Sequence, residues 1–337
     1  MLTRAEIKGF KCLRDVSVDL RPFNVLIGPN DSGKSSFLQA LRESSHLAPT
    51  SWPAWTLAEL ASIHLWTRES DLRLSFDPDR SLRWAVAWKG QPIDPDDPHV
   101  ARKLNEAARS FLRVCGPVVL DPQEISSLSP RGSGALDQLV ASRGRGTAAH
   151  LARVALGDRV RYEAIQQGMR DVTQDHVREV LLEEDIGQGY PLSFRLHDGK
   201  VIPAADASQG LLLSLGLLAL IHRHDDPALL LLEEPDKGLH PLRLSEVVRL
   251  LRTLPERGVQ VLLTTHSPDL VDACAPEEIL VFRRPEPGSG TEIHRLPADF
   301  KRRAMGASVG QVWASTGEEG LLANLPKIEG TQRVEAV

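Results

Sequence analysis

The sequence contains little cysteine, with three residues in a chain of 337: Cys12, Cys115 and Cys274. They lie far apart and form no CxxC pair, which argues against a zinc site and against a disulfide framework. So little cysteine fits a reducing compartment. We therefore expect a cytoplasmic protein.

Long apolar runs are also missing. No stretch approaches the roughly 18 or more uncharged apolar residues that a transmembrane helix needs. The longest run, residues 211–221, is interrupted by Ser214 and Gly216. The first eight positions carry acidic and basic residues and lack the apolar core of a signal peptide. We expect a protein without a membrane part.

Positive charge is not in excess: the chain has 40 Lys and Arg residues and 45 Asp and Glu residues, which gives a formal net charge of −5. This balance excludes a globally basic nucleic-acid binder but leaves room for a local basic groove. A hydrophobic content of 42% lets a chain of this length bury a substantial core. One large α/β domain or two lobes is the expectation.

The strongest motif follows an apolar run at residues 23–27. Residues 28–35 read GPNDSGKS, a complete GxxxxGK[ST] phosphate loop. A buried strand delivers such a loop, its backbone N–H groups turn toward phosphates, and the next helix points its positive dipole end at them. Lys34 is then expected to neutralise the β- and γ-phosphates of ATP, and Ser35 to hold Mg²⁺. The predicted nucleotide-binding residues of this segment are Asn30, Asp31, Ser32, Gly33, Lys34, Ser35 and Ser36.

The first half of the chain alternates between strand-like and helix-like patterns. Before the loop, three strands are predicted at 2–8, 14–20 and 23–28. They include an antiparallel strand pair that leads into the core of the phosphate-loop domain. After a helix to about residue 45, we expect an irregular insertion at 46–66, strands at 71–77 and 82–89, a helix at 99–113 and a strand at 116–121. Residues 126–146 are rich in Ser, Gly and Arg and predict a connection. Residues 147–185 predict a helical hairpin that is too short for a long coiled-coil arm.

The second half predicts a lobe of the βαβ type. It begins with a hairpin around 197–200 and a long apolar helix at 208–224. The expected strands are 229–232, 259–265, 278–283 and 291–296, with helices at 241–254 and from 268. The fold class predicted for the whole chain is α/β, with a central, mostly parallel sheet.

Two carboxylates close the apolar run at 229–232. Glu233 is expected to bind Mg²⁺ through water, and Glu234 to orient or deprotonate the attacking water. A pair of glutamates after leucines is weak by itself, but it is strong downstream of a phosphate loop. His266 ends the next predicted strand, which should place it beside Glu234. We favour a γ-phosphate sensor over a buried structural histidine.

Ser208-Gln209-Gly210 opens the apolar helix. A serine at a helix start is an ordinary N-cap, and the same geometry makes an anion site. Because the chain's own phosphate loop already holds its nucleotide, Ser208 and Gly210 would be free to face the γ-phosphate on a second subunit.

In this order and at these intervals, the segments GPNDSGKS, SQG, LLLLEEPDKGLHP and TTHSP resemble the Walker A, signature, Walker B/D-loop and H-loop elements of ABC-class ATPases. The opening IKGFK and the form EEPDKGLHP resemble the soluble SMC/RecF-like and OLD-type branch more than the transporter branch. The resemblance implies a P-loop NTPase of ABC type with an N-terminal antiparallel β-lobe and a small helical insertion. It divides the chain into an N-terminal lobe (1–125), a helical insertion (126–190), a C-terminal lobe (191–300) and a C-terminal tail (301–337).

By the same resemblance, ATP and Mg²⁺ are bound in a head-to-tail homodimer that forms with ATP. Lys11 is implied to contact nucleotide phosphate or DNA, and His240 takes the D-loop position that transporters fill with Asp. The signature ASQGLL departs from LSGGQ, and Gln123 is only a weak candidate for the Q-loop glutamine. OLD-type nucleases carry a C-terminal nuclease domain, for which the roughly 40 residues after the last predicted strand are too few.

The function expected from these residues is ATP hydrolysis by a nucleotide-gated dimer. It would act on DNA or on a separately encoded nuclease or effector, in DNA repair or anti-phage defence. The alternatives are a slow nucleotide-gated scaffold and, with a poorer fit, the ATP-binding subunit of a membrane transporter. Three basic clusters are either solvated surface or part of a DNA groove: 143–145, 283–284 and 301–303.

Overall fold

A computed structural model describes most of the chain. The described residues are 1–44, 62–68, 70–76, 82–88, 91–93, 113–127, 143–182, 191–223, 226–286 and 288–325. Within them, no helix is both long enough and apolar enough to cross a membrane. The predicted helix at 99–113, apart from its last residue, lies outside the described residues, as do residues 46–61 and most of the connection at 126–146.

The central sheet has the strand order β15-β14-β3-β13-β12-β8. Five of these strands, from β14 to β8 in this order, run parallel to one another. The sixth strand, β15, pairs antiparallel with β14 at one edge. The strands are β3 (Phe23–Ile27), β8 (Val114–Val118), β12 (Leu229–Glu233), β13 (Gln260–Thr264), β14 (Ile279–Arg283) and β15 (Glu292–Arg295). Every residue of β3 and β13 is buried, as expected for central parallel strands covered on both faces. The predicted α/β fold with a mostly parallel central sheet is confirmed.

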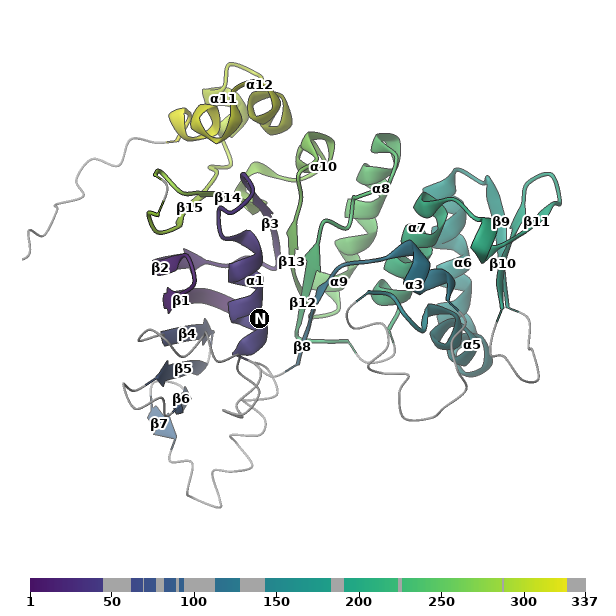
Figure 1. The fold of residues 1–337 in the computed structure, drawn as a ribbon, viewed down its shortest axis with the longest axis horizontal. Coiled ribbons are helices and arrows are strands. Elements are labelled where there is room, and N and C mark those ends of the chain that lie inside the picture. The colour runs from purple at the N-terminus through teal and green to yellow at the C-terminus, as the bar shows by residue number, and fades with distance from the viewer. Residues whose placement is uncertain are drawn as a thin grey trace, which may run out of the picture.

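Helices follow the carboxyl ends of these strands. They are α1 (Lys34–Glu43) after β3, α8 (Pro241–Leu251) and α9 (Thr253–Glu256) after β12, and α10 (Pro268–Asp272) after β13; a 3₁₀ turn, η4 (Pro276–Glu278), leads into β14. The phosphate loop, the two glutamates and His266 therefore leave the sheet at one edge, at the top of Figure 1.

A second, antiparallel sheet forms the N-terminal β-lobe, with the order β2-β1-β4-β5-β6-β7. Its strands are β1 (Leu2–Phe10), β2 (Leu13–Asp19), β4 (Ser62–Thr67), β5 (Ser70–Phe76), β6 (Leu82–Trp88) and β7 (Gln91–Ile93). The expectation of an irregular insertion was wrong for its last residues. Ile63 and Leu65 are buried and their neighbours are not, which is the period of a strand with one face in the core.

The two sheets share a core around α1. Phe37, Leu38 and Leu41 are fully buried in one cluster with Ile7 of β1 and Leu262 of β13. At the edge of this core, the Gln260 side chain accepts a hydrogen bond from the Leu2 amide (2.8 Å) and donates to the Leu2 carbonyl (2.9 Å). This buried amide fixes the β-lobe to the central sheet.

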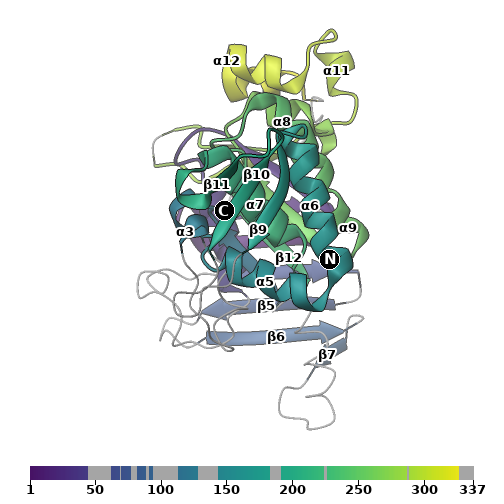
Figure 2. The same cartoon turned by 90° about the vertical axis from the view of Figure 1, so that its right-hand side faces the viewer.

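The far end of the molecule consists of helices and a small antiparallel sheet (Figures 1 and 2). Its elements are α3 (Pro122–Ser126), α5 (Thr147–Gly157), α6 (Arg159–Thr173), β9 (Val177–Leu182), β10 (Leu192–Leu196), β11 (Val201–Pro203), η3 (Ala204–Asp206) and α7 (Gln209–Ile221). The hairpin at 197–200 joins β10 to β11, as predicted. Helix α7 is buried from Leu211 to Ile221, which explains why its sequence is apolar on all sides apart from Ser214 and Gly216.

Two segment predictions differ from the structure. The helix expected to reach residue 185 ends at Thr173, because Gln174 and Asp175 adopt positive φ angles and the chain returns as β9. Residues 301–337 are more than a tail: α11 (Phe300–Arg303) and α12 (Val309–Ala323) pack on the carboxyl edge of the central sheet. The division of the chain into four segments stays a prediction.

Candidate functional site

The phosphate loop needs glycine at two positions. Gly28 has φ +140°, and a Cβ there would lie 2.1 Å from the carbonyl oxygen of Phe282. Gly33 has φ +105°, and its Cβ would lie 2.5 Å from Thr291 Oγ1. Neither space admits a side chain, so the loop lies directly against β14 and the chain before β15. The glycines give the loop a cradle of backbone groups close to the first turn of α1.

Lys34 is a largely buried cation at the start of α1, with 7% exposure. Its Nζ donates to the carbonyl oxygens of Gly28 (2.7 Å) and Pro29 (2.8 Å). Burial lowers the pKa of Lys34, while the negative charges of Glu234, Glu318, Asp31 and Glu233 raise it. In the described part of the chain, this buried ammonium is hydrogen-bonded to neutral carbonyls, and it is suited to bind an anion because charge-assisted hydrogen bonds are stronger.

Ser32 supports the same reading. Its Oγ is buried and has no hydrogen-bond partner among the described residues. Buried hydroxyls are normally paired, because an unpaired one costs about 1–3 kcal/mol. A phosphate oxygen in the loop would supply a partner for this hydroxyl.

Glu234 has an unusual backbone conformation, with φ +46°. Its amide donates to the carbonyl oxygen of Thr264 (3.0 Å) and lies 3.2 Å from Thr264 Oγ1. On the side chain, Oε1 lies 3.7 Å from His266 Nε2 and Oε2 lies 3.8 Å from Lys237 Nζ. β12 and β13 are adjacent parallel strands, so the carboxylate and the imidazole meet at their ends, as the sequence predicted.

These groups line one hollow of about 640 Å³, a size within the usual range for ligand sites. The predicted residues among its walls are Lys11, Asn30, Asp31, Ser32, Gly33, Lys34, Ser35, Ser36, Glu233, Glu234 and His266. Lys11 has φ 54°, and its Nζ donates to Gln39 Oε1 of α1 at 2.6 Å. Residues from four separate parts of the chain thus surround one space.

Three lining residues were not predicted to be there: Cys12, Thr264 and Arg284. Arg284 follows β14, and its Nε donates to the carbonyl oxygen of Ser289 (3.0 Å). The sequence showed it only as half of a basic pair assigned to surface or a DNA groove. Cys12 directly follows Lys11, and Thr264 is the first residue of the TTHSP segment, so these two predicted positions are the signal that could have found them.

Ser208 and Gly210 do not line this hollow. Ser208 caps α7, and its Oγ accepts from the Leu211 amide at 3.3 Å. At Gly210, an added Cβ would lie 3.2 Å from the carbonyl oxygen of Gly238, so the helix start lies against the D-loop segment. His240 caps α8 through Nδ1, 3.3 Å from the Leu242 amide, and Gln123 is exposed in the first turn of α3.

The oxygen donors in the hollow fit Mg²⁺ bound together with a substrate better than a metal ion bound by protein side chains alone. The described part of the chain contains no group of three or more His, Cys, Asp or Glu side chains that could hold a metal ion. Ser35 and Glu233 bring two oxygen donors into the hollow. Mg²⁺ usually keeps several waters and binds through one or two protein oxygens plus substrate phosphates.

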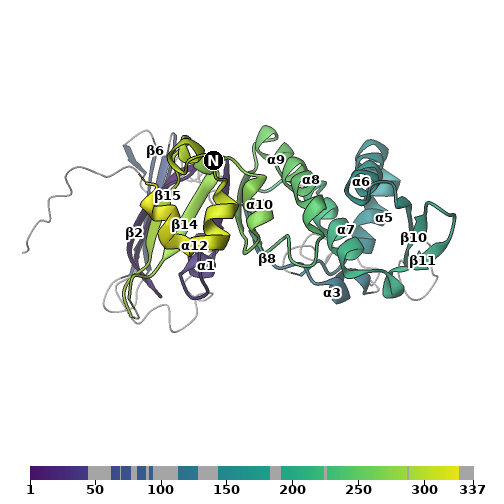
Figure 3. The same ribbon diagram turned by 90° about the horizontal axis from the view of Figure 1, so that it is seen from above.

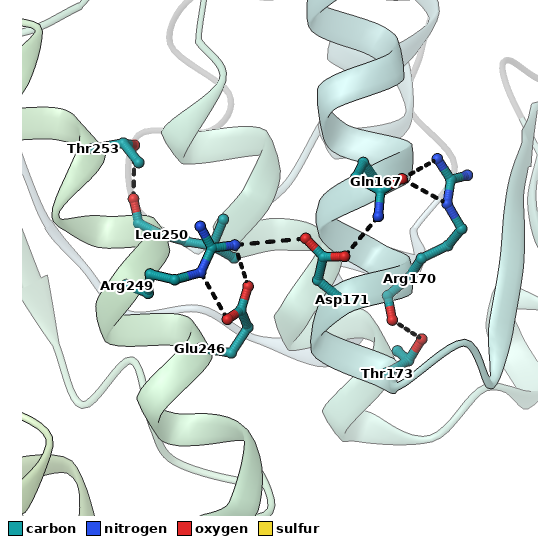
Figure 4. A network of polar contacts seen from close by, with 8 residues as sticks. All are labelled: Gln167, Arg170, Asp171, Thr173, Glu246, Arg249, Leu250 and Thr253. Atoms are coloured by element: carbon teal, nitrogen blue, oxygen red, sulfur yellow. Dashed lines mark hydrogen bonds and ion pairs between the residues drawn. The ribbon is translucent and has the colours of Figure 1, made fainter.

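The helix after the carboxylates is joined to the helical end of the molecule by a polar network (Figure 4). Arg249 of α8 pairs with Glu246 on its own helix and lies 3.5 Å from Asp171 of α6. Gln167 donates to Asp171 Oδ1 at 2.6 Å. The network is solvent-exposed, so it orients α8 and α6 more than it stabilises them.

Comparison with known proteins gives two family matches. Residues 1–44 match the family described as "AAA ATPase domain", and residues 153–272 match "AAA domain, putative AbiEii toxin, Type IV TA system". The fold is similar to SMC heads. The SMC head domain from Thermotoga maritima has a TM-score of 0.52 at 14% identity, covering 88% of this chain and 99% of that one. The Smc head from Pyrococcus furiosus, bound to the C-terminal domain of ScpA, has a TM-score of 0.55 at 14% identity, covering 90% and 98%.

Two ATPase-domain matches and the fold of SMC heads together support an ABC-type ATPase of the SMC, RecF and OLD-like kind. Among curated proteins, the chain is 30% identical over 81 residues to an OLD nuclease of Thermus scotoductus, covering 23% of the chain and 15% of that nuclease. It is 33% identical over 66 residues to the energy-coupling factor transporter ATP-binding protein EcfA of Methanococcus maripaludis, covering 20% and 22%. The matches thus span less than a quarter of either relative.

The predicted basic clusters are largely paired with acidic residues of the same chain. Arg143 pairs with Asp121 (2.9 Å) and Arg145 with Glu124 (3.3 Å). The other pairs join Arg283 to Glu292, and Arg302 and Arg303 to Asp299. These arginines have acidic neighbours, as a solvated surface would provide.

Proposed function

We propose that this ABC-type ATPase binds ATP with Mg²⁺ and hydrolyses it between two head-to-tail subunits. We further propose that the dimer, by closing when it binds ATP and opening after hydrolysis, acts on DNA or on a separately encoded nuclease or effector. The observation that carries the proposal is the single hollow that collects the phosphate loop, both carboxylates and His266.

Phosphate binding falls to Lys34 and the loop. The Lys34 ammonium exchanges the carbonyl oxygens of Gly28 and Pro29 for phosphate oxygens, and the Ser32 hydroxyl gains a partner. Ser35 and Glu233 would hold Mg²⁺, which neutralises phosphate charge when bound.

Water activation falls to Glu234. Its carboxylate lies at the mouth of the loop with Oε1 3.7 Å from His266 Nε2, so both side chains can reach one water molecule beside a γ-phosphate. The carboxylate accepts a proton from that water or orients it, and the imidazole donates to the phosphate.

The second subunit is proposed because the signature serine stands apart from its own loop. Ser208 and Gly210 do not line the phosphate hollow, although Ser208 opens a helix whose N-terminus can bind an anion. A γ-phosphate of another copy gives this helix end a ligand. A head-to-tail pair of two identical chains forms two such composite sites.

A role in DNA repair or anti-phage defence is supported by the names of similar proteins. One matching family is described as a putative AbiEii toxin of a type IV toxin–antitoxin system, and one curated relative is an OLD nuclease. DNA or an effector protein is therefore the proposed target of the dimer. A slow nucleotide-gated scaffold is the alternative, and it requires turnover slower than dimer dissociation.

The variant Glu234→Gln tests this function. It is expected to retain ATP but to hydrolyse it at least ~100-fold more slowly, as when a general base is lost. ATP-bound dimer should accumulate in light scattering. The control is Glu256→Gln, which removes an exposed carboxylate on α9 and should turn over like the unaltered chain. Unchanged turnover in Glu234→Gln would mean that Glu234 has only a structural role.

A further inference from the structure

The C-terminal helix α12 lies over the end of the molecule that carries the phosphate loop. Figures 1 and 3 show α12 above the first turn of α1, where Lys34 begins the helix. The helix is firmly seated, because the Asp272 carboxylate of α10 accepts from the Ser308 hydroxyl (2.7 Å) and from the Gly310 amide (2.7 Å). Leu321, near its end, is fully buried.

A kink redirects the second half of α12. Gly317 has φ 65° and ψ −159°, which breaks the helix at a position where glycine is strongly favoured. Across this kink, Trp313 Nε1 donates to Glu318 Oε1 at 2.9 Å. The bond fixes the direction of the Glu318 carboxylate, whereas the neighbouring Glu319 is exposed.

The negative charge of Glu318 has an electrostatic effect on Lys34 of the phosphate loop. Its negative charge raises the pKa of Lys34 against the lowering by burial, and among the charges that do so only Glu234 has a larger effect. A carboxylate from the C-terminal helix is thus within electrostatic reach of the ammonium proposed to bind the β- and γ-phosphates.

We propose that Glu318 sets the nucleotide affinity of the phosphate loop, because its carboxylate, held over the loop by α12 and Trp313, repels the phosphates that Lys34 attracts. The proposal rests on the nucleotide binding proposed above. Like charges in a partly desolvated site repel more strongly than in bulk water. Bound ATP is therefore expected to displace the carboxylate by movement at Gly317.

The test replaces Glu318 with Gln, which removes the charge but keeps an acceptor for Trp313. Titration calorimetry with a non-hydrolysable ATP analogue and Mg²⁺ should give at least about fivefold tighter binding, with a smaller gain for ADP, which carries less charge. Glu319→Gln is the matched control, because it removes the same charge from an exposed neighbour; it should change affinity by less than about twofold.

Two further measurements separate repulsion from a packing effect. Glu318→Ala should tighten binding as Glu318→Gln does, and its unfolding temperature reports whether α12 remains seated. Trp313 emission should change when the analogue binds, measured as the difference between the unaltered chain and Trp313→Phe, because the Glu318 contact is broken.

The outcomes are distinct. If the unaltered chain binds the analogue, Lys34→Ala does not, and Glu318→Gln and Glu318→Ala bind no more tightly, the Glu318 proposal is wrong and the nucleotide site stands. An equal gain in Glu319→Gln also contradicts it, because the effect would then be general surface charge. If the unaltered chain binds no nucleotide, both proposals are wrong.

Discussion

Glu234 breaks a local rule at the centre of the site. A non-glycine residue at φ +46° carries strain of order 1–3 kcal/mol, which the surrounding structure must offset. The offset comes from the next strand, through the bond between the Glu234 amide and the Thr264 carbonyl oxygen. The strained turn points the carboxylate along the mouth of the phosphate loop, toward His266.

Lys34 is the residue on which nucleotide binding depends most. In Lys34→Ala, Mg-ATP binding should fall below detection in titration calorimetry, because the main fixed positive charge of the loop is lost. The fold should survive, since among the described residues Lys34 Nζ donates to carbonyl oxygens of its own loop alone. Lys200→Ala, which removes the same charge from an exposed hairpin, should bind normally. Unchanged affinity in Lys34→Ala would remove the phosphate-loop assignment.

At the scale of elements, the sequence predicts what depends on neighbours along the chain. The apolar run before GPNDSGKS becomes β3, and the leucines before Glu233 become β12, because continuous burial leaves a continuous apolar pattern. β9 could not be predicted in this way. Its buried residues Val177 and Val180 are three apart, a spacing that also fits a helix, and the positive φ of Gln174 leaves no sequence signal comparable to glycine.

The residues of the site also divide into those that a local sequence pattern predicts and those that it does not. The phosphate loop, Glu233, Glu234 and His266 each carry their own motif, and parallel strand order brings them together. Arg284 lines the hollow and the charge of Glu318 acts on Lys34, although both residues come from the C-terminal part of the chain. Their positions depend on how β14 and α12 pack against the loop, and no local pattern encodes such long-range packing.

Helix α5 carries a buried titratable group, His150, with 3% exposure. Burial, aided by the charge of Arg153, lowers its pKa to about 4. Above about pH 6.5, His150 is neutral in both the folded and the unfolded chain. Between about pH 6.5 and pH 4, His150 takes up a proton in the unfolded chain but not in the folded chain. The free energy of unfolding therefore falls as the pH is lowered through this range. The expected loss between pH 7 and pH 5 is at most about 2 kcal/mol.

Urea unfolding at the two pH values measures this loss. His150→Asn keeps a side-chain amide near Nδ1 but cannot titrate, so its stability should fall less between pH 7 and pH 5. His222, whose pKa is also lowered to about 4, keeps part of the pH dependence in the variant. An equal fall in both proteins would show that His150 is protonated without cost in the folded state.

At the scale of the whole molecule, the hollow at the carboxyl edge of the central sheet collects the proposed nucleotide-site residues except Ser208 and Gly210. The buried Gln260 side chain holds the β-lobe to this sheet, and the network of Arg249 and Asp171 links α8 to the helical end. Under the proposed function, the chain contains both halves of a nucleotide site but does not join them. Joining them is the role proposed for the second copy.

Ser208→Arg separates the two halves of the site. Each monomer should still bind ATP, because the phosphate loop is untouched. ATP-dependent dimerisation should be lost, since a bulky side chain cannot fit between a helix end and a phosphate. Normal dimerisation of this variant in light scattering would leave Ser208 as a helix cap only.

The most direct measurement of the composite site is the ATPase activity of a mixture of Ser208→Arg and Lys34→Ala, each inactive alone. A heterodimer can assemble one intact site from the phosphate loop of the first and the signature of the second. The account predicts that partial activity returns on mixing and grows with the concentration of the second protein. If both variants are folded and mixing restores no activity, the head-to-tail composite site is contradicted.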